Sequence, residues 1–402
     1  MRLGILQLPY NIDNLKQIVS NLQCFDGTVV LLDDSRKLKL AESFSLPANC
    51  ELVACDVSDA EQLVSLAARL ALDNLVSFSE LGLRTAAAVR ERTGFAGHGE
   101  QVELNTVDKY RMRTTLAEHG LSSVATRRCG AAQLRDALAS IALPAIVKPA
   151  DLTGSICVQL IAHIDEVDGY LERVARNAYT KHSDFVVESY VTGDEYSVEG
   201  LLLDGEVHLY GITEKFTTGV PYFVETGHAF HAKHPLLEAV DAQLPPIFRA
   251  LGMRTCPFHI EFKMVDGRIE IIEIHSRFGG GFITKLIELS LDSPIFLDYA
   301  NYLKTGKIPE KRAASDRITA IHFVMCRSGR VETRDLVDPT DHDWILEHQC
   351  GKAVGDTVEA ATGYYDRPAY YLYDAPSARC RGGTTCIAGG FSLHRPVTAS
   401  TA

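Results

Sequence analysis

Short apolar runs alternate with stretches of helical periodicity over about the first hundred residues, and this alternation restricts the folds open to the chain. Leu3–Leu8 and Thr28–Leu32 have the composition of strands. Between them apolar residues recur at helical spacing, at Ile12, Leu15, Ile18 and Leu22. The pattern continues with strands expected at Leu52–Cys55 and Asn74–Phe78 and helices expected at Glu61–Leu72 and Arg84–Arg92. A strand–helix–strand series predicts a parallel sheet with helices on its faces.

The periodicity changes after a helix that we expect to start at Thr106, as its N-cap, and to end at Gly120. Short strands then follow closely, at Ala145–Lys148, Ile156–Ile161, Phe185–Val191, Tyr196–Leu203 and Glu206–Ile212. Helices at Ile164–Ala178 and Leu236–Leu251 interrupt them, which is α+β composition. A chain of 402 residues is long enough for two or three domains.

Charge and cysteine content exclude several classes of function. The net charge of −12 argues against a nucleic-acid partner, whose phosphates would be repelled. No run approaches the roughly 18 apolar residues needed to span a bilayer, so we expect no membrane partner. The ten cysteines include no Cys-x-x-Cys pair, so neither a zinc knuckle nor a redox motif is indicated. Free thiols in a reducing, cytoplasmic location are the simplest interpretation.

The segment 256–277, CPFHIEFKMVDGRIEIIEIHSR, is expected to form a hairpin with one apolar and one polar face. The apolar positions are Ile260, Phe262, Met264, Ile272 and Ile274, and the polar positions are His259, Glu261, Lys263, Glu273, His275 and Arg277. A two-residue turn would put Glu261 and Glu273 on opposite faces, so we expect a three-residue loop with Gly267 in the left-handed conformation. Glu273 would then be the diagonal neighbour of Glu261, within reach of a shared ion.

The residues after the hairpin favour a site for a magnesium–phosphate complex. Two close carboxylates repel one another unless a cation lies between them, and magnesium prefers oxygen ligands. Gly279–Gly281 precede a helix expected at Thr284–Leu291, where exposed N–H groups attract anions. Arg277 adds a planar positive group suited to phosphate. The alternative is a solvated strand face on which Lys263 and Arg277 pair with the glutamates.

Several segments, taken in order, resemble the ATP-grasp superfamily and in particular carboxylate–amine ligases of the L-amino-acid ligase type. They are SELGLRTAAAVRERTGFAGHG, VDKYRMRTTLAEHGL, AIVKPADLTGS, FVVESYVTGDEYSVEG, FVETGH, FHIEF and IIEIHSRFGGG. The resemblance covers about residues 78–302. It implies an α/β and α+β multidomain fold, with a Rossmann-like N-terminal domain (1–105), an ATP-grasp domain (106–305, its small lobe at about 122–195) and a β-rich C-terminal α+β lobe (306–402) whose tail has a disordered composition.

The resemblance also implies a nucleotide site. Lys109 and Lys148 match the two lysines that bind the ATP phosphates. Glu188, Ser189, Tyr190 and Val191 match the hinge strand that contacts adenine, and Glu195 matches the acid that binds the ribose. Ser155, with Thr153 and Gly154, falls where the family has a mobile flap over the phosphates; the flap here is short.

By the same resemblance, Glu261 and Glu273 match the magnesium carboxylates. His275 stands where the family usually has Asn, so it either supports a ligand or shifts the preference toward Mn²⁺. Arg277 and Lys148 are the expected catalytic residues, since Arg277 matches the arginine that stabilises the transferred phosphoryl group. The expected substrate-binding residues are Glu225, His228, Arg277, Gly280 and Gly281.

The function implied is ATP-dependent joining of a carboxylate and an amine, both expected to be amino acids, through an acyl phosphate. Two alternatives remain open at this stage. One is a carboxylase or purine-pathway-type ligase on the same fold, and the other is a nucleotide-binding regulatory module without catalysis. The sequence names neither substrate and leaves open whether the chain is a homodimer.

Overall fold

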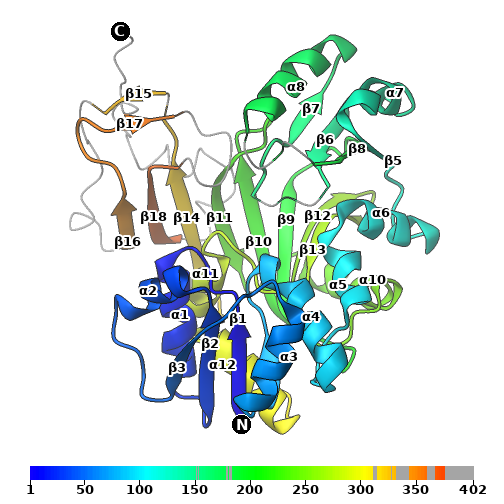
Figure 1. Ribbon diagram of the computed structural model, residues 1–402. Coiled ribbons are helices and arrows are strands. Elements are labelled where there is room, and N and C mark those ends of the chain that lie inside the picture. The colour runs from blue at the N-terminus through cyan, green and yellow to red at the C-terminus, as the bar shows by residue number, and fades with distance from the viewer. Residues whose placement is uncertain are drawn as a thin grey trace.

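The computed structural model describes residues 1–150, 152, 154–177, 180, 183–310, 315–326, 328–331, 344–359 and 367–375. The expectations for Thr153, for Cys380 and Cys386 and for the last 25 residues lie outside this part of the chain. The described residues form a mixed α/β multidomain structure with four sheets. In Figure 1 the N-terminal part lies at the bottom, a small lobe at the upper right, and a long sheet runs between them.

The N-terminal sheet is parallel, as the strand–helix alternation predicts. Its strands lie in the order β3 (Cys50–Ala54), β2 (Thr28–Asp33), β1 (Arg2–Leu6) and β4 (Asn74–Val76). Its helices are α1 (Ile12–Leu22), α2 (Ser35–Glu42), α3 (Ala60–Arg69) and α4 (Glu80–Thr93). Side chains of Asn11, Asp34 and Asp59 accept hydrogen bonds from the first turns of α1, α2 and α3. These caps fix the residues at which the helices begin. Helix α4 begins beside the candidate active site.

One helix boundary differs from the prediction. A helix was expected to start at Thr106, but Thr106 lies near the end of α5 (Glu100–Val107). The next helix, α6, runs from Lys109 to Glu118. Asp108 separates them, because its backbone is extended and its carboxylate accepts hydrogen bonds from the N–H groups of Tyr110 and Arg111. Asp108 is therefore the N-cap, and Lys109 occupies the first position of α6. Gly120 follows this helix in the left-handed conformation, as expected.

The small lobe is a four-stranded antiparallel sheet with helices on it. Its strand order is β5 (Thr126–Cys129), β8 (Phe185–Ser189), β6 (Ala145–Pro149) and β7 (Gln159–Ile161). Two short turns of 3-10 helix, η1 (Ala131–Gln133) and η2 (Ile164–Glu166), precede α7 (Leu134–Ala139) and α8 (Val167–Arg176). A separate core that includes Val147, Tyr170 and Phe185 stabilises this lobe.

An eight-stranded sheet forms the centre of the molecule. Its order is β13 (Arg268–His275), β12 (Cys256–Val265), β9 (Glu195–Leu203), β10 (Glu206–Thr217), β11 (Glu225–His231), β14 (Ile318–Val324), β18 (Ala369–Ala375) and β16 (Ile345–Cys350). The C-terminal strands therefore extend the central sheet, and β15 (Gly329–Arg330) pairs separately with β17 (Thr357–Val358). The helices after β11 and β13 are α9 (Leu237–Asp241), α10 (Leu244–Leu251), α11 (Ile283–Leu291) and α12 (Ile295–Thr305).

The two faces of this sheet belong to different cores, as alternate residues of β9 show. Leu202 packs in a core with α6 and α10, whereas Leu201 and Leu203 pack in a core with α1, α11 and α12. The same face as Leu201 becomes polar toward the start of β9, at Ser197 and Glu199, where the small lobe approaches. This polar half of the face is where the predicted site residues gather.

The hairpin of β12 and β13 differs from the prediction in its turn and in its register. Asp266 and Gly267 form a two-residue turn, and both have positive φ, 48° and 78°. A bulge between Glu261 and Phe262 then adds one residue to β13, so that Glu261 lies directly opposite Glu273. The three-residue loop and the diagonal arrangement were therefore wrong, although the shared face was right. Ile272, expected in the core, lines a cavity instead.

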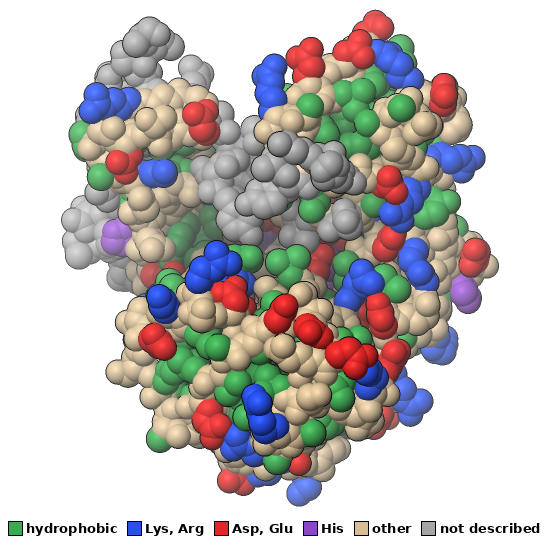
Figure 2. Space-filling view, in the orientation of Figure 1, with side chains coloured by type: hydrophobic (Ala, Val, Ile, Leu, Met, Phe, Trp, Pro, Cys, Tyr) green, Lys and Arg blue, Asp and Glu red, His purple; other side chains and the backbone are tan. Residues whose placement is uncertain are grey.

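The amino-acid sequence carries expectations about both membrane-spanning helices and surface charge. No helix among them is both long and apolar enough to cross a bilayer. Acidic and basic side chains are interspersed over the described part of the face drawn in Figure 2.

Candidate active site

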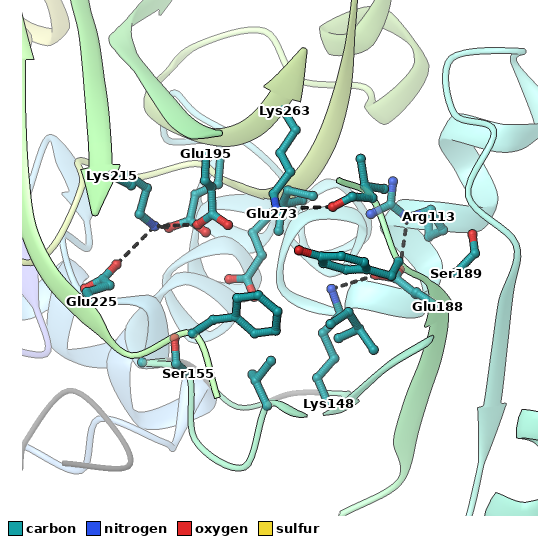
Figure 3. A pocket seen from close by; sticks show the side chains of 18 residues that line it. Arg113, Lys148, Ser155, Glu188, Ser189, Glu195, Lys215, Glu225, Lys263 and Glu273 are labelled. Carbon is teal, nitrogen blue, oxygen red and sulfur yellow. Dashed lines mark hydrogen bonds and ion pairs between the residues drawn. The ribbon is translucent and has the colours of Figure 1, made fainter. Parts of the chain in front are cut away.

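A cavity lies between the small lobe and the polar half of the central sheet (Figure 3). Ten residues predicted from the sequence line it: Lys148, Ser155, Glu188, Ser189, Tyr190, Val191, Glu195, Glu225, Glu261 and Glu273. Five lining residues were not singled out by the sequence: Arg113, Ile146, Val158, Lys215 and Phe223. The predicted residues that do not line the cavity are Lys109, His228, His275, Arg277, Gly280 and Gly281.

The floor of the cavity carries the two carboxylates of the hairpin. Glu261 forms an ion pair with Lys215, and its Oε1 lies 3.2 Å from Nε2 of His259. Glu273 lies 3.4 Å from Nζ of Lys109 and 3.3 Å from Nε2 of His275. Burial opposes ionisation of both groups, but the neighbouring cations outweigh it. Lys215 lowers the pKa of Glu261 to about 2, and Lys109 holds the pKa of Glu273 well below its usual range.

His275 and Arg277 lie just behind Glu273 and meet a residue of the N-terminal domain. Nδ1 of His275 is 3.3 Å, and a guanidinium nitrogen of Arg277 is 2.6 Å, from Oε2 of Glu80. Glu80 is the first residue of α4, and its side chain is 8% exposed. Burial would raise the pKa of Glu80, but the charges of His275 and Arg277 lower it overall. The strand end is therefore bound to the N-terminal domain by a buried carboxylate that the sequence did not indicate.

Both predicted phosphate-binding lysines are buried and paired. Lys148 lies 2.8 Å from Oε2 of Glu188, and Lys109 donates a 2.6 Å hydrogen bond to the carbonyl of Leu152. Glu188 also accepts from Arg113 at 2.9 Å. Although burial opposes ionisation, the charges of Arg113 and Lys148 lower the pKa of Glu188 to about 2. A lysine on a helix surface would usually be solvated, so the burial of Lys109 favours a role in the site.

Lys215 of β10 is the positive centre of the other wall. Its Nζ lies 3.0 Å from Glu225 and 3.5 Å from Glu195, besides its ion pair with Glu261. These carboxylates keep the pKa of Lys215 raised well above its ordinary value in spite of burial. No sequence signal pointed to Lys215, because the strand expected in this region ended at Ile212, whereas β10 continues to Thr217.

Glu225, His228 and Gly281 meet beyond Lys215. Nε2 of His228 lies 3.6 Å from Oε2 of Glu225, and a Cβ added at Gly281 would lie 2.8 Å from the same nitrogen. Burial lowers the pKa of His228 although Glu225 opposes this. Gly281 has φ of +62°, whereas Gly280 is exposed and has nothing within 4 Å of an added Cβ. Of the two glycines, Gly281 alone touches the predicted substrate residues.

Two aromatic rings and the segment Gly154–Ser155 also line the cavity. The rings of Tyr190 and Phe223 lie 5.8 Å apart, and Lys263 lies 5.2 Å from the Tyr190 ring. Nζ of Lys263 also donates to the carbonyl of Val191 at 3.2 Å. Gly154 and Ser155 both have positive φ, 69° and 56°, where they line the opposite side.

The donor set fits a divalent cation that is bound together with phosphate. Among the described residues no three His, Cys, Asp or Glu side chains are grouped closely enough to hold a metal ion by themselves. Two carboxylates on the floor are what magnesium commonly takes from a protein, since phosphate oxygens and water supply the other ligands. Lysines now compensate the charge of both carboxylates, and a cation could replace that compensation.

The chain is similar in sequence to several known proteins. The sequence family described as the ATP-grasp domain matches residues 141–285. Residues 141–285 therefore resemble an ATP-grasp domain. It is 30% identical over 248 residues to the alanine–anticapsin ligase of Bacillus subtilis, a match that covers 55% of this chain and 51% of that protein. It is 26% identical to the L-arginine-specific L-amino acid ligase of Bacillus subtilis over 76% of both chains. The chain spans about half the length of the alanine–anticapsin ligases that it matches.

Two solved structures have the same overall fold as this chain. The L-amino acid ligase of Bacillus licheniformis superposes with a TM-score of 0.77 at 20% identity, over 96% of this chain and 97% of that one. The N5-carboxyaminoimidazole synthetase of Staphylococcus aureus, which was solved with ADP, has a TM-score of 0.69 at 14% identity, over 94% and 93% of the two chains.

Proposed function

We propose that this protein is an ATP-dependent carboxylate–amine ligase that joins two amino acids and releases ADP and phosphate. The observation that carries the proposal is the direct pairing of Glu261 with Glu273 on the cavity floor, with the buried Lys109 beside Glu273 and the buried Lys148 in the cavity wall beside Glu188. Ligases that make amides from amino acids are among the similar proteins, which favours amide formation over carboxylation.

In this proposal the nucleotide lies in the cavity between the lobes. Lys109 and Lys148 bind its phosphates, and the backbone of Glu188–Val191 reads the adenine. Glu195, at the far wall, binds the ribose hydroxyls, and Ser155 covers the phosphates. Each of these side chains either lines the cavity or reaches its floor.

Glu261 and Glu273 would hold Mg²⁺ or Mn²⁺ between them. Such an ion would neutralise the phosphate charge and polarise the γ-phosphoryl group when bound. The ring nitrogens of His275 lie 3.3 Å from Glu273 and 3.3 Å from Glu80, so we propose that it orients Glu273 and does not bind the metal directly. That choice decides between the two alternatives that the sequence left open.

The substrates would meet the phosphates from the side of Lys215. A substrate carboxylate attacks the γ-phosphorus, the bond from the γ-phosphorus to the bridging oxygen breaks, and ADP leaves. Arg277 and Lys148 stabilise the charge that develops on the phosphoryl oxygens. The amine of the second substrate then displaces phosphate from the acyl phosphate, and the amide bond forms. Glu225, His228 and Gly281 would line the amino-acid pocket, with Gly280 at its rim. No protein nucleophile is needed, because positioning and electrostatics are sufficient for this chemistry.

The remaining assignments follow from the same proposal. Residues 1–105 form the N-terminal Rossmann-like domain, 106–305 the ATP-grasp domain and 306–402 the C-terminal lobe. A ligase of free amino acids would work in the cytoplasm with small-molecule partners alone, as a monomer or a homodimer.

Phosphate release across pairwise amino-acid mixtures tests the proposal, with mass spectrometry of the products. We expect release only when a competent pair is present, together with a product whose mass equals the pair minus water. Release stimulated by bicarbonate without any amino acid would point to a carboxylase. ATP binding without release in every mixture would point to a regulatory module.

A further inference from the structure

Two segments of the chain cross between the small lobe and the central sheet, and both rest on the same end of the β12–β13 hairpin. The first crossing, 119–125, joins α6 to β5, and the second, 190–194, joins β8 to β9. Glu270 contacts the first crossing and Lys263 contacts the second. These two residues are cross-strand partners in the hairpin, so one short piece of sheet supports both connections.

Glu270 uses both carboxylate oxygens on the first crossing. Its Oε1 accepts from the hydroxyl of Ser122 at 2.5 Å, and its Oε2 accepts from the N–H and hydroxyl of Ser123 at 3.1 and 3.2 Å. Arg113 of α6 donates a further 2.8 Å hydrogen bond to Oε1. Glu270 is buried, so these bonds to a charged acceptor are strong.

Arg113 carries the contact onward to a proposed phosphate-binding lysine. Its Nε donates to Oε1 of Glu188 at 2.9 Å, while the other oxygen of Glu188 lies 2.8 Å from Nζ of Lys148. Figure 3 shows Arg113, Glu188 and Lys148 in this order along one wall of the cavity. The side chain of Arg113 is only 1% exposed, so water does not replace these bonds.

Lys263 fixes the second crossing at the same level. Its Nζ donates to the carbonyl of Val191 at 3.2 Å and lies 5.2 Å from the ring of Tyr190. Both residues line the cavity. The hairpin that carries Glu261 and Glu273 therefore also holds the hinge of the small lobe.

We propose that Glu270 and Arg113 are positioning residues for nucleotide binding, acting through Glu188 on Lys148. The inference rests on the proposed function, because Lys148 matters here as a ligand of the phosphates. A lysine ammonium lies on a flexible stem, and among the described residues Glu188 is the carboxylate that pairs with Lys148 and sets the position of its ammonium in this wall. Glu188 is in turn held by Arg113, and Arg113 by Glu270, so loosening Glu270 shifts the ammonium.

A double-mutant cycle tests this inference, with the affinity for Mg·ADP measured by calorimetry. The four proteins are wild type, Glu270→Gln, Lys148→Met and the double variant. If Glu270 acts through Lys148, we expect Glu270→Gln to weaken binding about fivefold or more in the wild-type background. In the Lys148→Met background it should weaken binding less than about twofold. If two residues act independently, the affinity loss of the double variant equals the product of the two single losses to within about twofold. A double variant of Glu270→Gln and Lys148→Met whose loss equals that product would overturn the inference.

Controls separate this effect from a general loss of structure or charge. Asp266→Asn removes a carboxylate from the exposed tip of the same hairpin and should leave Mg·ADP affinity unchanged. If Glu270→Gln does not fold, the Ser122→Ala/Ser123→Ala variant keeps Glu270 and removes both hydroxyl bonds. It should show the same dependence on Lys148, and full multiplication there would count equally against the inference.

The outcome for the wild type distinguishes the two proposals. If wild-type protein does not bind Mg·ADP, the proposed function is wrong and this inference is wrong with it. If wild-type protein binds Mg·ADP and the two substitutions act independently, only the positioning role is wrong.

Discussion

Replacing Arg277 with Ala gives a direct test of the proposed chemistry. Arg277 lies just beyond the end of β13, the strand that carries Glu273, and it does not line the nucleotide cavity. Its guanidinium is held 2.6 Å from the carboxylate of Glu80. Its proposed role is to stabilise charge that develops on the transferred phosphoryl group. An interaction of that kind raises turnover and contributes little to binding of the ground-state nucleotide.

The size of the effect can be estimated from the geometry. Removal of one preorganised donor to a developing oxyanion costs roughly 2.7–4 kcal/mol, which is about a hundred- to a thousandfold in turnover. Stability should fall by about 1–3 kcal/mol, because Glu80 would lose a charged partner while buried. That loss is at the lower end of this range, since His275 still lies 3.3 Å from Glu80.

Phosphate release under saturating substrates, Mg·ADP affinity by calorimetry and urea unfolding would be measured on the same preparations. We expect turnover to fall at least about a hundredfold while the dissociation constant for Mg·ADP changes less than about threefold. Arg254→Ala is the matched control, because Arg254 is 75% exposed and pairs only loosely with Asp204 at 3.7 Å. Turnover of Arg277→Ala within about twofold of the wild type would refute the reasoning.

Three further substitutions have defined outcomes. The pKa of Glu188 is lowered from 4.5 to about 2, so its ion pairs stabilise the fold above pH 4.5 and are lost as the pH falls toward 2. Glu188→Gln should therefore lower the free energy of unfolding at pH 7. The variant should also lose less stability than the wild type below pH 4.5, as urea titrations at several pH values would show. Gly281→Ala places a Cβ 2.8 Å from Nε2 of His228 and should raise the KM for amino acids severalfold. Gly280→Ala places a Cβ with nothing within 4 Å and should leave the KM unchanged. Equal KM values for the two variants in steady-state kinetics would count against the pocket assignment. His275→Asn should lower turnover with Mg²⁺ and Mn²⁺ by similar factors if His275 only orients Glu273, and a loss confined to one metal would indicate direct coordination.

Much of the fold follows from local patterns in the sequence. The parallel N-terminal sheet follows from alternating apolar runs, and its first strands run at Arg2–Leu6 and Thr28–Asp33, close to where the pattern put them. Two strands of the small lobe are shorter than predicted, since β7 begins at Gln159 and β8 ends at Ser189, whereas β6 continues one residue further, to Pro149. Their ends are decided by contacts between the lobes, which a local pattern does not contain.

The hairpin shows why a correct conclusion can rest on a wrong register. The preference of Asp266 and Gly267 for a two-residue turn prevailed over the simple alternation of faces. A bulge at Ile272 then restored the shared face of Glu261 and Glu273. Alternation alone does not reveal a bulge, because an apolar residue is equally compatible with a core and with the wall of a nucleotide cavity.

The charged partners of the site were the least predictable part. Lys215 and Arg113 are single basic residues in a strand and a helix, and nothing nearby in the sequence distinguishes them from solvated side chains. Their roles depend on partners far along the chain, such as Glu261 for Lys215 and Glu270 for Arg113. These residues come together only when the central sheet forms, so a local sequence pattern does not show that they are partners.

The central claim is that Glu261 and Glu273 share the divalent ion of a bound nucleotide. Anomalous diffraction from Mn²⁺ in crystals grown with ADP tests it most directly. We expect one strong peak between the two carboxylates, next to the ADP phosphates and close to Lys148. A peak elsewhere, or ADP bound outside the cavity between the lobes, would contradict the account.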